Sequence, residues 1–194
     1  MDDQPLGHVT IVGVGDAGCA AVDRLIGEGI NRVQFIAVNT FAGALAKSKA
    51  TTRLLLGEHT ARGLGTGGSP DLGRKAAEEN AQMLFRTLED TDTVFVVYGI
   101  GGGTGTGAAP VIAGIGKEMR AQVIAVASLP FTFEGSHRQQ IAQFGLPLLK
   151  AQTDKLTIIS GDNLLKFAVK DASMQQAYTL LCGALAWGVI GHLT

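Results

Sequence analysis

Cysteine is scarce in this sequence. The 194 residues include two cysteines, Cys19 and Cys182, and their separation does not fit the ligand spacing of a metal site. The N-terminus shows no signal peptide, so the expected compartment is the reducing cytoplasm. We therefore expect a cytoplasmic protein without a bound metal in its fold.

The sequence also lacks an excess of charge and a long apolar run. It has 16 Lys and Arg against 17 Asp and Glu, with no basic run, which argues against a nucleic-acid partner. The longest apolar stretch, residues 180–193, is too short to span a bilayer, so we expect no direct membrane insertion. With 46% hydrophobic and 17% charged residues, the chain is globular and long enough for one domain with a sizeable core.

Glycine is abundant by contrast, and its densest segment is residues 99–107, GIGGGTGTG. Residues 93–98 before it are typical of a buried strand, and residues 108–115 after it have helical spacing with Pro110 in the first turn. The glycines would then precede a helix N-terminus, where unpaired N–H groups and the helix dipole favour an anion such as phosphate. The alternative is a flexible glycine turn.

The run GGGTGTG followed by Ala-Ala-Pro closely resembles the signature loop of the tubulin/FtsZ superfamily. This resemblance implies a GTP- or GDP-binding domain of a prokaryotic cytoskeletal protein of the cell-division type, and it allows Mg²⁺ with GTP. It extends from about residue 8 to residue 194, so it covers almost the whole chain.

A second glycine turn follows the first predicted strand, residues 8–12. Residues 13–18, GVGDAG, match the GxGxxG pattern of dinucleotide-binding folds, and a helix is expected from Ala20 onward. That pattern requires an acidic residue about 20 residues further on, yet the second strand, residues 32–38, ends at Asn39-Thr40. This argues against NAD. FtsZ carries Asn-Thr-Asp at this place, and here Phe41 stands at the acidic position.

Two further segments strengthen the resemblance. Residues 63–79, with Ser69 as expected helix cap and Pro70 after it, resemble the FtsZ loop that senses the γ-phosphate. Residues 130–135, PFTFEG, resemble the FtsZ segment whose glutamate binds ribose, which implies that role for Glu134 and a position beside the nucleotide for Arg138. The alternatives are an ordinary capped glycine loop and solvated surface charges.

The C-terminal part predicts a sixth strand at 156–160 and a long helix over 171–193. The resemblance makes this the central helix of FtsZ and places Tyr178 against the base, although a core aromatic fits the spacing equally well. Strands that alternate with helices predict a doubly wound, mostly parallel α/β sheet flanked by helices, with the ligand at the carboxyl ends of the strands. We expect a single domain over residues 1–194, with a loose arm at 1–7.

The resemblance assigns nucleotide contacts to a set of residues drawn from these loops. They are Gly15, Asp16, Ala17, Thr66, Gly67, Gly68, Gly101, Gly102, Gly103, Thr104, Gly105, Thr106, Gly107, Glu134, Arg138, Asn163 and Tyr178.

Two departures from the family pattern qualify the expected activity. The aspartate-bearing loop that follows the central helix in FtsZ, and that acts on a neighbouring subunit's nucleotide, is not among these residues. We therefore expect slow hydrolysis, and whether the chain acts as a GTPase stays open. The helix around Trp187 is apolar and needs a cover, which in FtsZ is the second domain. If the chain is complete, self-association or binding to other FtsZ-like subunits is expected to supply that cover. The alternative function is a non-hydrolysing assembly module with weak or relaxed nucleotide binding.

The second departure concerns the base. Ala20, Gly161 and Gly183 stand where the family has polar base-reading residues, and Asp16 replaces a glycine beside the phosphates. Asn163 is expected to compensate in part. The sequence therefore predicts relaxed base selectivity in a site whose phosphate end is intact.

Overall fold

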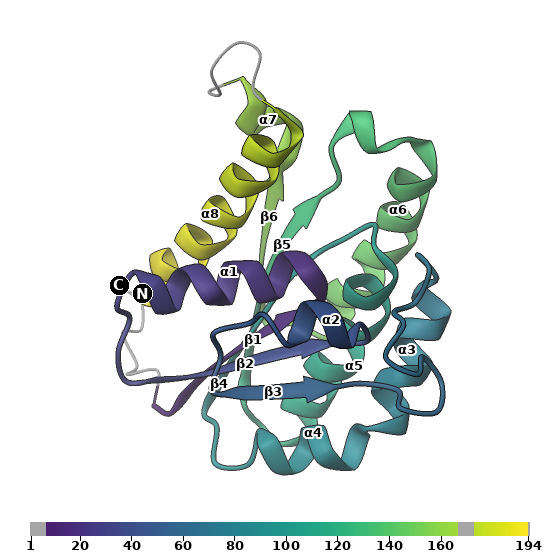
Figure 1. Ribbon diagram of the computed structural model, residues 1–194. Helices are drawn as coiled ribbons and strands as arrows, with labels where there is room; N and C mark the ends of the chain where they lie inside the picture. Colours follow the sequence, from purple (N-terminus) through teal and green to yellow (C-terminus); the bar gives the residue numbers. More distant parts are fainter. Residues whose placement is uncertain (1–6, 167–172, 194) are drawn as a thin grey trace.

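Six parallel strands form the centre of the molecule. The computed structural model describes residues 7–166 and 173–193. The strands are β1 (Val9–Val14), β2 (Val33–Asn39), β3 (Thr52–Leu55), β4 (Thr93–Gly99), β5 (Gln122–Leu129) and β6 (Lys155–Ser160). They lie in the order β3-β2-β1-β4-β5-β6, and every neighbouring pair is parallel. The predicted doubly wound α/β fold is confirmed (Figure 1).

Strands β1 and β4 lie side by side at the centre of the sheet. All six residues of β1 are buried, as are the first six of β4, and both consist largely of Val, Ile and aromatic side chains. Such continuous apolar strands are stable only where helices cover both faces of the sheet. In the register of the pair, Val14 lies opposite Tyr98, so the glycine turns that follow both strands emerge at the same edge.

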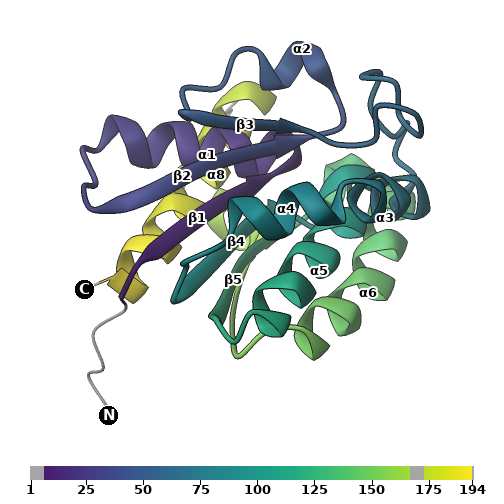
Figure 2. The same ribbon diagram turned by 90° about the horizontal axis from the view of Figure 1, so that it is seen from below.

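Helices cover both faces of the sheet (Figures 1 and 2). On one face lie α1 (Gly15–Gly27), α2 (Ala42–Leu45) and α8 (Met174–Leu193), which pack on alternate strand residues such as Ile11 and Phe95. On the other face lie α3 (Pro70–Glu79), α4 (Ala81–Thr87), α5 (Gly103–Glu118) and α6 (Ser136–Ala151). The 3-10 turn η1 (Thr132–Glu134) follows β5, and α7 (Gly161–Leu165) follows β6.

Two helices begin earlier than the sequence suggests. The structure starts α1 at Gly15 instead of Ala20, and α5 at Gly103 instead of residue 108, so Pro110 lies inside α5 and not in its first turn. The reason is that one glycine with positive φ suffices for each turn: Gly15 has φ of 70° and Gly101 has φ of 99°. Most of the signature glycines are therefore helical residues.

Helices α3 and α5 cross with almost no side chains between them. A Cβ atom on Gly73 would clash with the carbonyl oxygen of Gly103, and one on Gly107 would clash with that of Pro70 and lie 2.6 Å from the Arg74 nitrogen. Alanine, the next larger residue, therefore does not fit at this crossing. The contact fixes the distance between the loop before α3 and the loop before α5.

Some expectations concern residues outside the described part of the chain. The proposed arm at residues 1–7 is described only at Gly7, and the predicted start of the long helix at residue 171 also lies outside it, with α8 beginning at Met174 among the residues described. No helix within residues 7–166 and 173–193 is long and apolar enough to cross a bilayer. The same residues contain no group of three or more His, Cys, Asp or Glu side chains able to hold a metal ion.

Candidate nucleotide-binding cleft

Segments at the carboxyl ends of five strands, β1 to β5, meet in one cleft of about 690 Å³. It lies at the carboxyl edge of the sheet, where the chain leaves β1 and β4 for helices on opposite faces, which is the usual position of a ligand in a doubly wound fold. Most of the residues predicted from the sequence line it. They are Gly15, Asp16, Ala17, Thr66, Gly67, Gly68, Gly101, Gly102, Gly103, Thr104, Gly105, Glu134, Arg138 and Tyr178.

Three predicted residues do not line the cleft, and each has a contact elsewhere. The Thr106 hydroxyl accepts a hydrogen bond from the Gly101 N–H at 2.9 Å, which fixes the turn before α5. Gly107 packs against Pro70 at the α3 crossing. The Asn163 side-chain oxygen accepts a hydrogen bond from the Lys166 amine at 2.8 Å.

The N-termini of α1 and α5 form one end of the cleft. Their caps, Val14 and Gly102, place no side-chain acceptor on the first N–H groups, and both helices are long enough to carry a substantial dipole. By contrast, the start of α3 is capped by Ser69, whose hydroxyl accepts from the Leu72 N–H at 3.3 Å, as predicted. The N–H groups of α1 and α5 are therefore the ones offered to an anion.

Open space beside three glycines fits a polyphosphate. A Cβ atom on Gly67, Gly68 or Gly102 would meet no atom within 4 Å, so the backbone there is bare toward the cleft. Gly67 and Gly68 also have positive φ, which makes their conformation costly for other residues. Bare backbone at helix N-termini is the arrangement that lets phosphate oxygens approach amide donors.

Asp16 is held away from the bare backbone by a hydrogen bond. Its carboxylate accepts from the Asn39 side-chain amide at 2.8 Å, and the Asn39 oxygen accepts from the Phe41 N–H at 3.1 Å. Close by, the hydroxyls of Thr40 and Thr104 are 2.6 Å apart and hydrogen-bonded. The loop after β2 is thus joined to both α1 and α5.

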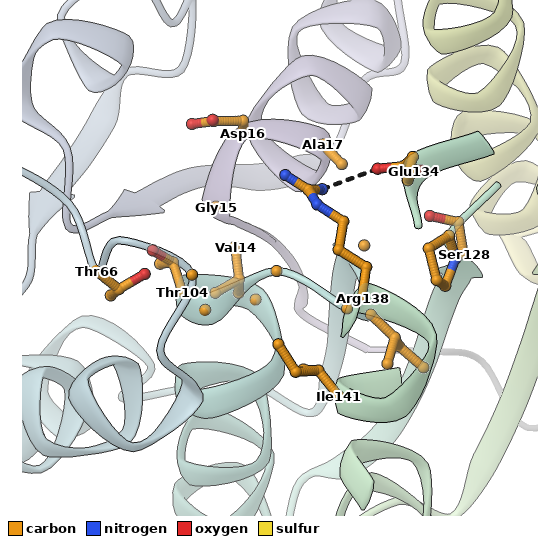
Figure 3. A pocket seen from close by; sticks show the side chains of 18 of the residues that line it. Val14, Gly15, Asp16, Ala17, Thr66, Thr104, Ser128, Glu134, Arg138 and Ile141 are labelled. Atoms are coloured by element: carbon orange, nitrogen blue, oxygen red, sulfur yellow. Dashed lines mark hydrogen bonds and ion pairs between the residues drawn. The ribbon is translucent and has the colours of Figure 1, made fainter. Parts of the chain in front are cut away.

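Glu134 and Arg138 form an ion pair at the opposite side of the cleft. The Arg138 guanidinium lies 2.9 Å from one carboxylate oxygen of Glu134, and the Phe131 N–H donates to the other oxygen at 2.9 Å. Figure 3 shows the Arg138 side chain reaching from α6 toward Glu134. The Glu134 side chain is 6% exposed and that of Arg138 is 52% exposed, so the carboxylate is buried and the guanidinium is open to solvent.

Tyr178 lies both at the cleft and in an aromatic cluster. Its ring lines the cleft and packs edge-on against Phe131, with the ring centres 5.6 Å apart. Burial, followed by a hydrogen bond to Glu134, raises the pKa of Tyr178 to about 12. The phenol is therefore neutral at physiological pH, with an apolar face toward the cleft.

The end of the cleft between α1 and α8 carries few polar groups. Ala20, Leu181 and Cys182 line it, and the only carboxylates among the described lining residues are Asp16 and Glu134. The absent side chain of Gly183 would point at the Arg24 guanidinium, 3.5 Å from its Cβ position, and that of Gly161 would meet the Phe131 ring. The Phe131 ring therefore excludes a side chain at position 161, whereas position 183 has only an ordinary van der Waals contact.

Sequence analysis missed several lining residues. Leu181 and Cys182 follow Tyr178 by three and four positions, so helical spacing could have identified them. Ser128 could have been inferred from its place at the end of β5. No sequence signal marks Leu64, on a loop, or His137 and Ile141, on α6, as lining residues.

Comparison with known proteins identifies the family of this chain. The family described as Tubulin/FtsZ family, GTPase domain, matches residues 8–169. An empty FtsZ dimer from M. jannaschii is similar with a TM-score of 0.93 and 40% identity, over 96% of this chain and 54% of that one. CetZ2 from Haloferax volcanii, solved as a GTPγS-bound protofilament, is 27% identical with a TM-score of 0.86, over 96% of this chain and 58% of that one.

CetZ1 from Haloferax volcanii, solved as a GDP-bound monomer, is 28% identical with a TM-score of 0.83, over 94% of this chain and 59% of that one. The chain thus spans between half and two thirds of the length of these solved chains. Fold, glycine loops and family match agree with the resemblance found in the sequence. The chain belongs to the tubulin/FtsZ family, and it comprises the family's GTPase domain.

Proposed function

We propose that the cleft binds GTP or GDP with the phosphates on the N-termini of α1 and α5 and the ribose at Glu134. The observation that carries this proposal is the meeting of two uncapped helix N-termini with bare glycine backbone in one cleft. Glu134 offers acceptors for sugar hydroxyls, and the exposed Arg138 can turn from the carboxylate to a phosphate. The base then lies between α1 and α8, against Tyr178.

Hydrolysis by this domain alone is slow in our proposal. A general base must lie within reach of the attacking water. The two carboxylates among the described lining residues are both engaged, Asp16 by Asn39 and Glu134 by Phe131 and Arg138. An acidic group from a second subunit would complete the site. If magnesium bound with GTP, the Asp16 carboxylate and the Thr104 hydroxyl would be the side-chain oxygens to hold it, and the ion would neutralise phosphate charge.

Gly102→Ala tests the phosphate end. The new methyl group would occupy the space left for phosphate without touching any protein atom within 4 Å, so the fold should be unaffected. We expect affinity for GDP, measured by calorimetry, to fall about tenfold because amide contacts are lost. Gly114→Ala, on the same helix and away from the cleft, should leave it unchanged. Equal affinity in Gly102→Ala and the unaltered protein would contradict the proposal, as would failure of the latter to bind GDP or GTP.

Self-association is a second candidate function, and one observation favours it. The outer face of α8 exposes Trp187, at 61%, together with Leu180, while Ala186 and Val189 of the same helix are buried against the sheet. An exposed tryptophan on an apolar helix is typical of an interface. This supports the assembly function that we infer for the chain, in keeping with the dimeric and protofilament forms of the FtsZ and CetZ2 structures.

Trp187→Ser tests this interface. We expect light scattering to give a dimer or larger species for the unaltered chain and a monomer for the variant, because the tryptophan would be the anchor of the contact. Phe85→Ser, which removes an exposed aromatic from α4 on the opposite face, is the control and should leave the mass unchanged. A monomeric unaltered chain at high concentration would rule the interface out.

A further inference from the structure

The turn that carries Glu134 is fastened to the start of α7 by one side chain. The Thr132 N–H donates to one oxygen of Asp162 at 2.9 Å, and the Thr132 hydroxyl donates to the other oxygen at 2.5 Å. Both oxygens of this carboxylate therefore hold a single residue of η1, thirty positions away in the sequence. Asp162 itself does not line the cleft.

A second contact joins the same two segments. The Phe131 ring is fully buried and lies against Gly161, where a Cβ atom would be 2.8 Å from two ring carbons. The ring also stacks on Phe133, with centres 4.8 Å apart, and meets Tyr178 edge-on. The start of α7 thus holds η1 from one side while the first turns of α8 hold it from another.

The position of Glu134 depends on this turn. Its carboxylate accepts the Phe131 N–H, so it is folded back onto the backbone that Asp162 and Gly161 hold in place. A turn of three residues has little structure of its own, and its conformation costs entropy unless other contacts fix it. Binding groups that are fixed before the ligand arrives bind it more tightly.

We propose that Asp162 is a positioning residue for nucleotide binding: by holding Thr132 it keeps Glu134 in place for the ribose hydroxyls. This inference rests on the proposed function, because it assigns to Asp162 a part in the ribose contact of Glu134. Asp162 acts through Thr132 and touches no ligand. Its removal should weaken the ribose contact and leave the phosphate contacts at α1 and α5 intact.

The ionisation of Asp162 sets the conditions for a test. The hydrogen bonds from Thr132, and more weakly the charge of Lys166, lower the pKa of Asp162 below its ordinary value. A lowered pKa means that the contact is fully present above the ordinary carboxyl range and is lost only as the pH falls through the lowered value. Measurements between about pH 6 and 8 therefore see a constantly ionised side chain.

The experiment compares GDP with 2′,3′-dideoxy-GDP, which lacks the ribose hydroxyls, by calorimetry on the full chain. The ribose advantage is the ratio of the affinity for GDP to the affinity for dideoxy-GDP. Asp162→Ala should weaken GDP binding about tenfold and leave dideoxy-GDP binding unchanged, so the ribose advantage disappears. Asp162→Asn should retain most of it, since the amide oxygen can accept the Thr132 N–H and the amide nitrogen can donate to the hydroxyl. Asp71→Ala is the matched control: Asp71, like Asp162, is an aspartate in the first turn of a helix, and its partners Arg74 and Lys75 belong to that helix.

Each outcome decides the matter. Equal ribose advantage in Asp162→Ala and the unaltered protein overturns the positioning role while the proposed function stands. Equal weakening of both nucleotides overturns it too, because the effect would not pass through Glu134. If the unaltered protein binds neither nucleotide, the proposed function fails and this inference with it. Should Asp162→Ala not fold, Thr132→Val removes the hydroxyl alone, and it must lower the ribose advantage about threefold for the proposal to hold.

Discussion

Gly107→Ala is expected to lower the free energy of unfolding by about 3 kcal/mol, the upper part of the usual range for overpacking. The added methyl group would meet the backbone of α3 at Pro70 and Arg74, and backbone cannot turn aside as a side chain can. In a helix, alanine is more stable than glycine by up to about 1 kcal/mol. The steric penalty of the methyl group must therefore be larger than the expected net loss in unfolding free energy. Chemical denaturation of the two proteins measures the difference.

The same substitution elsewhere in α5 provides the control. Gly114→Ala would meet only the end of the Gln152 side chain, at 3.6 Å, and should stabilise the protein by about 0.5 to 1 kcal/mol through helix propensity. Opposite signs for two identical substitutions in one helix would locate the effect in the α3–α5 crossing. If Gly107→Ala were as stable as Gly114→Ala, the two helices could not lie as close as they do here.

Gly183→Asp is expected to raise the preference for GTP over ATP at least tenfold. The resemblance places a base-reading carboxylate at this position, and an aspartate accepts both the guanine ring N–H and the exocyclic amine. A lost pair of such contacts is worth about 3 kcal/mol of discrimination. The Arg24 guanidinium lies 3.5 Å from the Cβ position, so it would keep the new carboxylate ionised without a clash.

Calorimetric titration of both nucleotides into the variant and the unaltered protein measures this preference. Gly191→Asp is the matched control: it adds the same charge to α8 at an exposed glycine that meets no atom within 4 Å and is remote from the lining residues. A strong preference for GTP in the unaltered protein would show that other groups already read the base. If the ratio of GTP to ATP affinity were unchanged in Gly183→Asp, the new carboxylate would be bound to Arg24 and would not reach the base.

The sheet and the phosphate end of the cleft could be predicted because their signals are local. Buried strands such as β1 and β4 appear as short apolar runs, and glycine turns follow them directly in the sequence. The N-cap at Ser69 was predictable for the same reason, since a hydroxyl before a proline marks a helix start. In a parallel sheet these local signals also determine which edge the loops share.

The early helix starts could not be predicted, because they depend on contacts between distant segments. Glycine is a poor helix former, so residues 103–107 indicate a loop when they are considered alone. Glycine is nevertheless required inside this helix, because the loop at residues 66–69 leaves no space for a side chain at Gly103 and α3 leaves none at Gly107. Likewise Gly161 suggests a missing base contact in sequence, whereas the structure shows that Phe131 occupies the space.

The α3–α5 crossing also limits how a bound nucleotide could alter the shape of this subunit. Since main chain meets main chain at Gly73, Gly103 and Gly107, neither helix can tilt or slide without the other, and the two behave as one rigid block. The segment free to respond is the short stretch of Thr66, Gly67 and Gly68 ahead of α3, where bare glycines permit backbone rotation. A response to the terminal phosphate would therefore be limited to a few backbone torsion angles in this loop. A neighbouring molecule that contacted the loop would respond to that change directly.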